Sequence, residues 1–179
     1  MKVFRLKFAS FFLICILLVG HSFSQQKTNA DSIRQKMQWF ADAKLGIFIH
    51  WGIYAVADVS ESWSFHNRQI SWKDYMNQSK SFTAAKYDPA DWASLIAASG
   101  ARYSVITTKH HDGVALWDTK ENHYSTVKNT PAKRDLLTSF YQELRKRNVK
   151  AGAYFSLIDW SHPDYPGFLK DSSRYAIKN

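Results

Sequence analysis

Apolar runs and helical segments alternate along this chain of 179 residues, and their order constrains the fold more than any other feature. Apolar, β-rich runs at 46–50, 101–113 and 149–160 predict three strands. Amphipathic segments at 88–100 and 134–148 predict a helix in each interval between them. Because strands that alternate with helices form βαβ units, we expect an α/β fold with a parallel sheet.

The expected helix at 88–100 has clear boundary signals. Asp88 is a suitable N-cap, Pro89 fits the first helical position, and Gly100 is a suitable stop. The residues expected to form its buried face are Trp92, Leu95 and Ile96. The first strand is apolar at successive positions, so we expect it to be buried on both faces.

The connections between the expected elements are unequal in length. Long segments at 55–87 and 116–133 follow strands, whereas the connections from helix to strand are short. This asymmetry is typical of a barrel whose active site lies at the carboxyl ends of its strands. A doubly wound sheet would carry a glycine-rich phosphate loop after the first strand, and "HWGIYAV" is not one.

The second strand ends in "KHHDG", a run of ionisable residues and a glycine. Side chains of adjacent strand residues point to opposite faces, so His110 and His111 share one pocket only if the backbone turns. Gly113 permits such a turn, and we expect both histidines to line the pocket. The alternative is that one histidine lines it and the other supports it from behind.

Four motifs together point to a known family: "GIFIHWGIYAV", "TTKHHDGVALWDTK", "KRDLL" and "GAYFSLIDW". Their order and spacing, over about residues 35–168, resemble the N-terminal half of the α-L-fucosidases of glycoside hydrolase family 29. The resemblance implies a (β/α)8 TIM-like catalytic barrel and retaining hydrolysis of terminal α-L-fucose. Since a whole barrel takes about 250 residues, we expect a partial barrel here, of about the first three βα units.

The resemblance also implies which residues contact the sugar. It predicts six substrate-binding residues, which are His50, Glu61, Trp63, His110, His111 and Tyr154. The family has adjacent Glu and Trp after strand one, whereas "ESW" here has Ser62 between them, through a bulge in the loop or a shifted correspondence. The family nucleophile is an Asp at the end of strand four. We therefore expect no catalytic residue in this chain, and a fragment that is inactive alone.

Two alternatives to an α-L-fucosidase fragment stay open. One is a metal-dependent hydrolase on a TIM-like barrel, because His50, His110, His111 and Asp112 are of ligand type. The other is a non-catalytic sugar-binding fragment. We expect no cofactor and no metal, and we expect a fucosylated glycan or glycoconjugate as the partner. An incomplete barrel would also leave sheet edges open.

The N-terminal residues read as a targeting segment followed by a domain. A basic start and a short apolar run predict a signal peptide over 1–24, followed by a polar leader at 25–30. The truncated catalytic barrel then spans 31–179, where Asp31 is expected to cap a helix over 32–42. We expect export to a periplasm or the exterior.

Composition limits the remaining possibilities. Cys15 is the only cysteine and lies in the expected signal peptide, which excludes a disulfide framework from the mature chain. The excess of 24 Lys and Arg over 15 Asp and Glu does not argue for nucleic acid, and we expect no membrane partner after signal cleavage. The sequence leaves the oligomeric state open.

Overall fold

The computed structural model describes residues 30–165, in two compact units that meet between Lys44 and Leu45. The first unit contains a helix over 30–43, which confirms the helix predicted at 32–42, but Asp31 lies within the helix, so the prediction that it caps the helix was wrong. The expected signal peptide at 1–24 and most of the leader at 25–30 lie outside the described residues. Within the described range, no helix is both long and apolar enough to cross a membrane.

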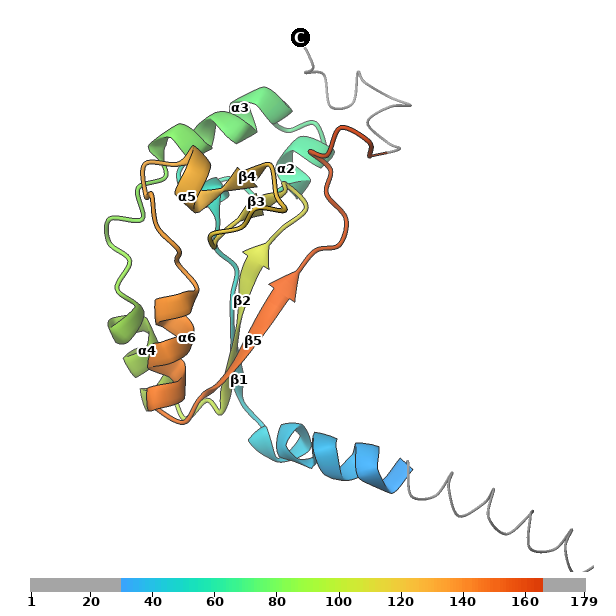
Figure 1. The fold of residues 1–179 in the computed structure, drawn as a ribbon, viewed down its shortest axis with the longest axis vertical. Helices are drawn as coiled ribbons and strands as arrows, with labels where there is room; N and C mark the ends of the chain where they lie inside the picture. The colour runs from blue at the N-terminus through green and yellow to red at the C-terminus, as the bar shows by residue number, and fades with distance from the viewer. Residues whose placement is uncertain (1–29, 166–179) are drawn as a thin grey trace, which may run out of the picture. The chain divides into compact units, whose positions relative to one another are not determined.

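The second unit is built on a sheet with three parallel strands, as the alternation of elements predicts (Figure 1). Strand β2 (Tyr103–Lys109) lies between β1 (Gly46–Ile49) and β5 (Lys150–Phe155) and pairs in parallel with both. Two short strands, β3 (Val114–Ala115) and β4 (Tyr124–Ser125), extend the sheet from the end of β2.

Two helices connect the parallel strands and lie side by side on one face of the sheet (Figure 1). Helix α4 (Pro89–Ala98) begins as predicted, because the Asp88 carboxylate accepts the N–H groups of Ala90 and Asp91. Gly100 has a φ of +82°, which suits a helix stop. Helix α6 (Thr138–Lys146) begins four residues later than predicted.

The carboxylate of Asp135 explains the late start of α6. It accepts the N–H groups of Leu137 and Thr138, which satisfies backbone donors of the first turn. At the other end, Asn148 follows α6 with a φ of +57°, a left-handed conformation in which helices commonly end. The residues before Thr138 therefore form the entry to the helix and not its first turn.

The hydrophobic core fills the space between the sheet and these two helices. Ile106 of β2 and Phe140 and Leu144 of α6 are fully buried in one cluster. The prediction that Leu95 faces this core was wrong, since its side chain is 71% exposed. Ala93 is buried instead, and a residue two positions further along a helix lies about 200° around its axis.

The opposite face of the sheet is open in the described part of the chain. Ile47 and Ile49 pack against the core, but Phe48, which points the other way, is 53% exposed. The prediction that β1 is buried on both faces was therefore wrong. The reason is that helices cover only one of its faces here (Figure 1).

The long connections contain short elements that the sequence pattern did not separate. Between β1 and α4 lie η1 (Ile53–Ala55), α2 (Trp63–His66), α3 (Trp72–Asn77) and η2 (Gln78–Ser81). Between β4 and α6 lies α5 (Thr126–Asn129).

The third strand is shorter than the predicted 149–160, because β5 ends at Phe155. The chain then bends over the end of β2, where the Ser156 N–H donates to the Lys109 carbonyl at 2.9 Å. The Trp160 N–H similarly donates to the His111 carbonyl at 2.7 Å. These bonds hold the segment after β5 against the polar end of β2.

Candidate functional site

The polar ends of the three parallel strands meet at one rim of the sheet. The ring centres of His50 and His110 are 4.9 Å apart, and those of His110 and His111 are 4.6 Å apart. The Tyr154 ring stacks against His110 with centroids at 5.6 Å. Four residues from three separate stretches of sequence thus form one cluster, which we call the rim cluster.

Each of the three parallel strands brings one residue of the rim cluster to the same edge of the sheet. His50 directly follows β1 and His110 directly follows β2, while Tyr154 lies in β5 opposite Thr107. The register between β2 and β5 shifts between Thr107 and Lys109, just before the histidine pair. Parallel strands end at the same edge of a sheet, so their terminal residues converge.

Glu61 and Trp63 of the "ESW" motif also reach the rim cluster. One carboxylate oxygen of Glu61 and one ring nitrogen each of His50 and His110 all lie within 4.8 Å of one another. The Trp63 ring lies edge-on to His111 at 6.1 Å. The intervening Ser62 turns inward, is fully buried, and hydrogen-bonds Nδ1 of His110. The extra residue thus supports the histidine.

The backbone turn that follows the histidine pair lets both rings share the rim. Gly113 has a φ of +79°, a conformation that side chains other than glycine rarely adopt. The Trp160 ring packs against His111, with ring centroids 4.3 Å apart. The two histidines differ in exposure, since His110 is 4% exposed and His111 is partly buried.

The hydrogen bonds of His111 determine its tautomer. The Ser156 hydroxyl donates to the Ile158 carbonyl at 2.7 Å, so its oxygen must accept from Nδ1 of His111 at 2.5 Å. Nδ1 of the neutral ring therefore carries the proton, and Nε2 is an acceptor. A hydroxyl that approaches Nε2 would be bound as a donor.

Burial keeps both imidazoles neutral. Desolvation, together with the neighbouring His111 and His50, lowers the pKa of His110 to about 3. Desolvation also lowers the pKa of His111, although a hydrogen bond to the Ile158 carbonyl opposes the change. Neutral imidazole offers one donor and one acceptor, which suits recognition of hydroxyl groups.

Asp112 supports the turn and does not face the rim. Its carboxylate is 2% exposed, accepts from the Tyr75 hydroxyl at 2.7 Å, and accepts from the Val114 N–H at 2.9 Å. Desolvation outweighs these two hydrogen bonds, which lower its pKa, and the net result is a pKa raised to about 6. Asp112 therefore caps the turn that follows the histidine pair.

Lys109 and Asp159 form the ion pair next to the turn. Their charged atoms are 3.7 Å apart, and the Lys109 ammonium also lies 4.9 Å from the centre of the Phe155 ring. Lys109 is 4% exposed, so this pair is largely removed from water. The pair joins the end of β2 to the segment after β5.

Sequence reasoning missed three supporting residues of the rim cluster. Ser62 and Ser156 each hydrogen-bond one histidine, and Trp160 covers the second. The polar residues after an apolar strand were a usable signal for Ser156. Ser62 had been read only as an interruption of the "ESW" motif.

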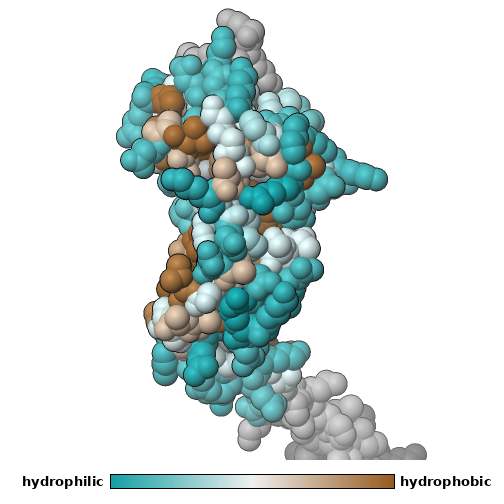
Figure 2. Space-filling view, turned by 90° about the vertical axis from the view of Figure 1, so that its left-hand side faces the viewer, coloured by the Kyte–Doolittle hydropathy of each residue, from teal (hydrophilic) through white to brown (hydrophobic). Residues whose placement is uncertain are grey.

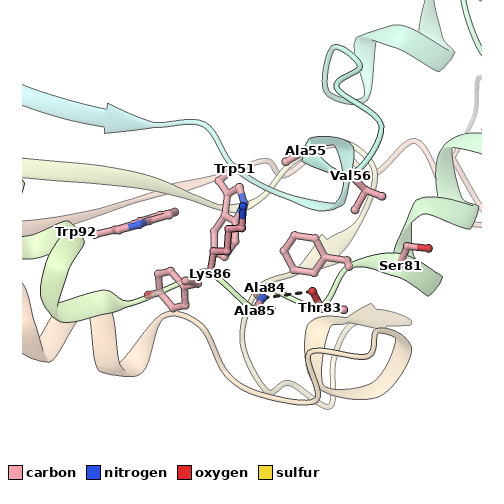
Figure 3. Close-up of a pocket in the computed structure, with 11 residues that line it drawn as sticks. Trp51, Ala55, Val56, Ser81, Thr83, Ala84, Ala85, Lys86 and Trp92 are labelled. Atoms are coloured by element: carbon pink, nitrogen blue, oxygen red, sulfur yellow. Dashed lines mark hydrogen bonds between the residues drawn. The ribbon is translucent and has the colours of Figure 1, made fainter.

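A separate hollow of about 590 Å³ lies on another side of this unit (Figure 3). Trp51 and Trp92 line it together with Val56, and none of the six predicted sugar-binding residues does. Elsewhere on the helical side, hydrophobic residues gather in small groups between hydrophilic ones (Figure 2). The neighbours His50 and Trp51 therefore serve different surfaces, the rim and this hollow.

Comparison with known proteins decides the family. The sequence model of α-L-fucosidase matches residues 16–178. The chain belongs to the α-L-fucosidase family. The tissue α-L-fucosidase of Macaca fascicularis is 33% identical over 183 residues, which cover 88% of this chain and 39% of that protein.

Solved structures of fucosidases have the same fold over the described part of this family member. Isoenzyme 1 from Paenibacillus thiaminolyticus has a TM-score of 0.72 at 39% identity, with 82% of this chain and 36% of that chain covered. A fucosidase from Bacteroides thetaiotaomicron, trapped as a covalent intermediate with 2-fluoro-fucosyl fluoride, has a TM-score of 0.67 at 32% identity. That match covers 78% of this chain and 35% of the other. The chain thus spans little more than a third of these relatives.

Proposed function

We propose that this chain forms the sugar-binding part of a retaining α-L-fucosidase, with terminal α-L-fucose of a glycan or glycoconjugate as its ligand. The observation that carries the proposal is the rim cluster, in which His50, His110 and Tyr154 converge from three strands. Family membership supports it, because the matched relatives are named as α-L-fucosidases.

The chemistry of the cluster suits a neutral deoxy sugar. Fucose carries hydroxyl groups and one methyl group, so its site needs directional polar atoms beside apolar surface. Neutral imidazoles, the Glu61 carboxylate and the Tyr154 hydroxyl supply the polar atoms. Trp63 is 42% exposed beside His111 and offers apolar surface for the ring or the methyl group.

Hydrolysis with retention needs two carboxyl groups about 5–5.5 Å apart, one as nucleophile and one as acid and base. Near the rim, Asp112 is buried and bonded to Tyr75, and Asp159 is paired with Lys109. Glu61 is the carboxylate that lies next to His50 and His110 of the rim cluster. We propose that the catalytic pair lies outside residues 30–165.

The same reasoning extends to the architecture. Three parallel strands with helices on one face match the start of a (β/α)8 barrel, and the proposed site lies where barrel enzymes bind substrate. We therefore propose that this unit is about the first three βα units of such a barrel. The edges of β1 and β5 would then pair with strands outside the described residues.

Two measurements test the proposed function. Nuclear magnetic resonance of the chain titrated with L-fucose should show shifts of the histidine ring signals, and His110→Ala should weaken binding at least about tenfold. His123→Ala, which removes an imidazole outside the rim cluster, is the matched control and should bind normally. An aryl α-L-fucoside should not be hydrolysed.

Two results would contradict the proposal. Equal fucose affinity in His110→Ala and the unsubstituted chain would remove the rim cluster from the binding site. Hydrolysis of the aryl fucoside that disappears in Glu61→Gln would place a catalytic carboxylate inside the described residues.

We also propose that the protein is exported. The support is the basic and apolar pattern of residues 1–24 alone. Expression in a bacterium and sequencing of the N-terminus of the exported protein should give a chain that begins at Gln25. An intact N-terminus on a cytosolic product would contradict this.

A further inference from the structure

We propose that His50, Glu61 and His110 bind one divalent transition-metal ion of the zinc or copper type. Their ligand atoms, two imidazole nitrogens and one carboxylate oxygen, lie within 4.8 Å of one another. Two histidines and a glutamate are a set that holds zinc in hydrolases while a fourth position stays open. Imidazole ligands favour zinc, copper and nickel over magnesium and calcium, which prefer oxygen.

Topology places these ligands on three different segments. His50 directly follows β1, Glu61 lies in the loop before α2, and His110 directly follows β2. Tetrahedral bonds of about 2.0–2.2 Å to zinc put ligand atoms roughly 3.3–3.5 Å apart. The three groups must therefore close by up to about 1.5 Å around the ion, within the reach of side-chain rotation.

One of the ligands is held in place and the other two can adjust. His110 is 4% exposed, and the fully buried Ser62 hydroxyl hydrogen-bonds its Nδ1, which leaves Nε2 to coordinate. A bond from the second ring nitrogen of a metal-binding histidine orients the ring and fixes its tautomer. His50 is exposed and Glu61 is partly exposed, so both can move toward the ion.

The charge at this place also favours a cation. Among residues 30–165, the Glu61 carboxylate makes no side-chain hydrogen bond and no ion pair with a lysine or arginine. The buried ammonium of Lys109 is already paired with Asp159 at 3.7 Å. A partly buried carboxylate beside two imidazole rings is stabilised by a positive charge, which a divalent ion supplies.

The experiment uses Cu²⁺ as an electron paramagnetic resonance probe and Zn²⁺ in calorimetric titration. The chain should bind one Zn²⁺, and the Cu²⁺ spectrum should show coupling to two nitrogens. His110→Ala should remove one nitrogen coupling and weaken Zn²⁺ binding at least about tenfold. Glu61→Gln, which keeps the side-chain shape, should retain both nitrogens and weaken Zn²⁺ binding.

A second histidine pair provides the control. The rings of His123 and His162 lie 5.5 Å apart, and Asp164 is 3.9 Å from His162. The double variant His123→Ala/His162→Ala should therefore keep the spectrum and the Zn²⁺ affinity of the unsubstituted chain. The metal inference is overturned if this variant alone loses the signal, if His110→Ala keeps it, or if the chain binds no Zn²⁺ at millimolar concentration.

Competition separates this inference from the proposed sugar site. If both hold, L-fucose should lower the apparent Zn²⁺ affinity, because the two ligands share His50, Glu61 and His110. Zn²⁺ binding that is insensitive to saturating fucose would support the metal site and count against the sugar site. Fucose binding without any Zn²⁺ binding would overturn the metal site and leave the sugar site intact.

Discussion

The two faces of the central sheet differ in what their side chains contact. On the helical face, Ile106 and Phe140 are fully buried in a continuous apolar cluster. On the open face, Phe48 is 53% exposed and contacts Tyr154, whose other neighbours are histidines. The comparison shows that the helical face contributes the apolar core, whereas the open face carries polar side chains toward its rim.

A second contrast lies at the rim itself. Asp112 and Thr107 are buried polar residues whose bonds brace the chain, whereas His50 and Glu61 are accessible to a ligand. Buried polar groups cost free energy unless they are hydrogen-bonded. The bonds from Tyr75 to Asp112 and from Trp51 to Thr107 meet that need. The rim therefore combines side chains that a ligand can reach with buried, hydrogen-bonded residues that hold the backbone in place.

The largest expected effect comes from replacing a phenylalanine on the helical face, compared with the same substitution on the open face. Phe140→Ala should lower the free energy of unfolding by about 3–5 kcal/mol, because it leaves a cavity in the core. Phe48→Ala should cost less than half as much, since that ring is already 53% exposed. Urea denaturation of both variants measures the difference. Equal losses would mean that the open face is covered in solution.

The next prediction concerns the pH dependence of stability, on which the buried groups His110 and Asp112 have opposite effects. His110 has a pKa of about 3 in the fold against 6.5 unfolded, so stability falls as pH drops from 6.5 toward 3. Asp112 has a pKa of about 6 in the fold against 3.8 unfolded, so stability rises as pH drops from 6 toward 3.8. Each slope is at most about 1.4 kcal/mol per pH unit.

These slopes oppose each other between pH 6 and 3.8, and single variants should separate them. Asp112→Asn should lose stability with acid more steeply than the unsubstituted chain, and His110→Gln less steeply. Urea denaturation at several pH values checks this. Identical pH profiles for all three proteins would show that neither group is buried as described.

Removal of one buried donor should have an intermediate effect. Tyr75→Phe leaves Oδ2 of Asp112 without its 2.7 Å hydrogen bond and should cost about 1–3 kcal/mol. Because that bond lowers the pKa of Asp112, the variant should also raise this pKa further. Tyr141→Phe, at a partly buried tyrosine of α6 whose hydroxyl donates to the Gly152 carbonyl, is the matched control and should leave the pKa of Asp112 unchanged.

The smallest expected effect tests the support beneath His110. Ser62→Ala removes the hydrogen bond to Nδ1 and should cost about 1 kcal/mol. The ring should then exchange between tautomers, which ¹⁵N chemical shifts of His110 report. Ser60→Ala is the control: Ser60 lies two residues earlier and is exposed, so the substitution should change neither the stability nor the tautomer of His110.

Much of the fold follows from local sequence. The cap at Asp88, the stop at Gly100 and the alternation of strands and helices are all local patterns, and the structure confirms them. The errors arose where burial depends on neighbours. Leu95 and Phe48 are apolar residues in regular elements, but no described element covers either one.

For the candidate site, the sequence indicated which residue types gather but not how they are held. Family motifs predicted the six residues, and the structure brings all six to one rim, while their role in binding sugar stays a prediction. Ser62, Ser156 and Trp160 escaped notice because each acts through contacts across the chain. No local pattern encodes such contacts.

By itself, the sequence determined the order of strands and helices, since caps, stops and apolar periodicity act over a few residues. Tertiary structure alone decided that residues 50, 61, 110 and 154 are neighbours, because parallel strands bring distant segments to a common edge. It also decided the protonation of His110, since desolvation depends on every group packed around the ring and not on its place in the chain.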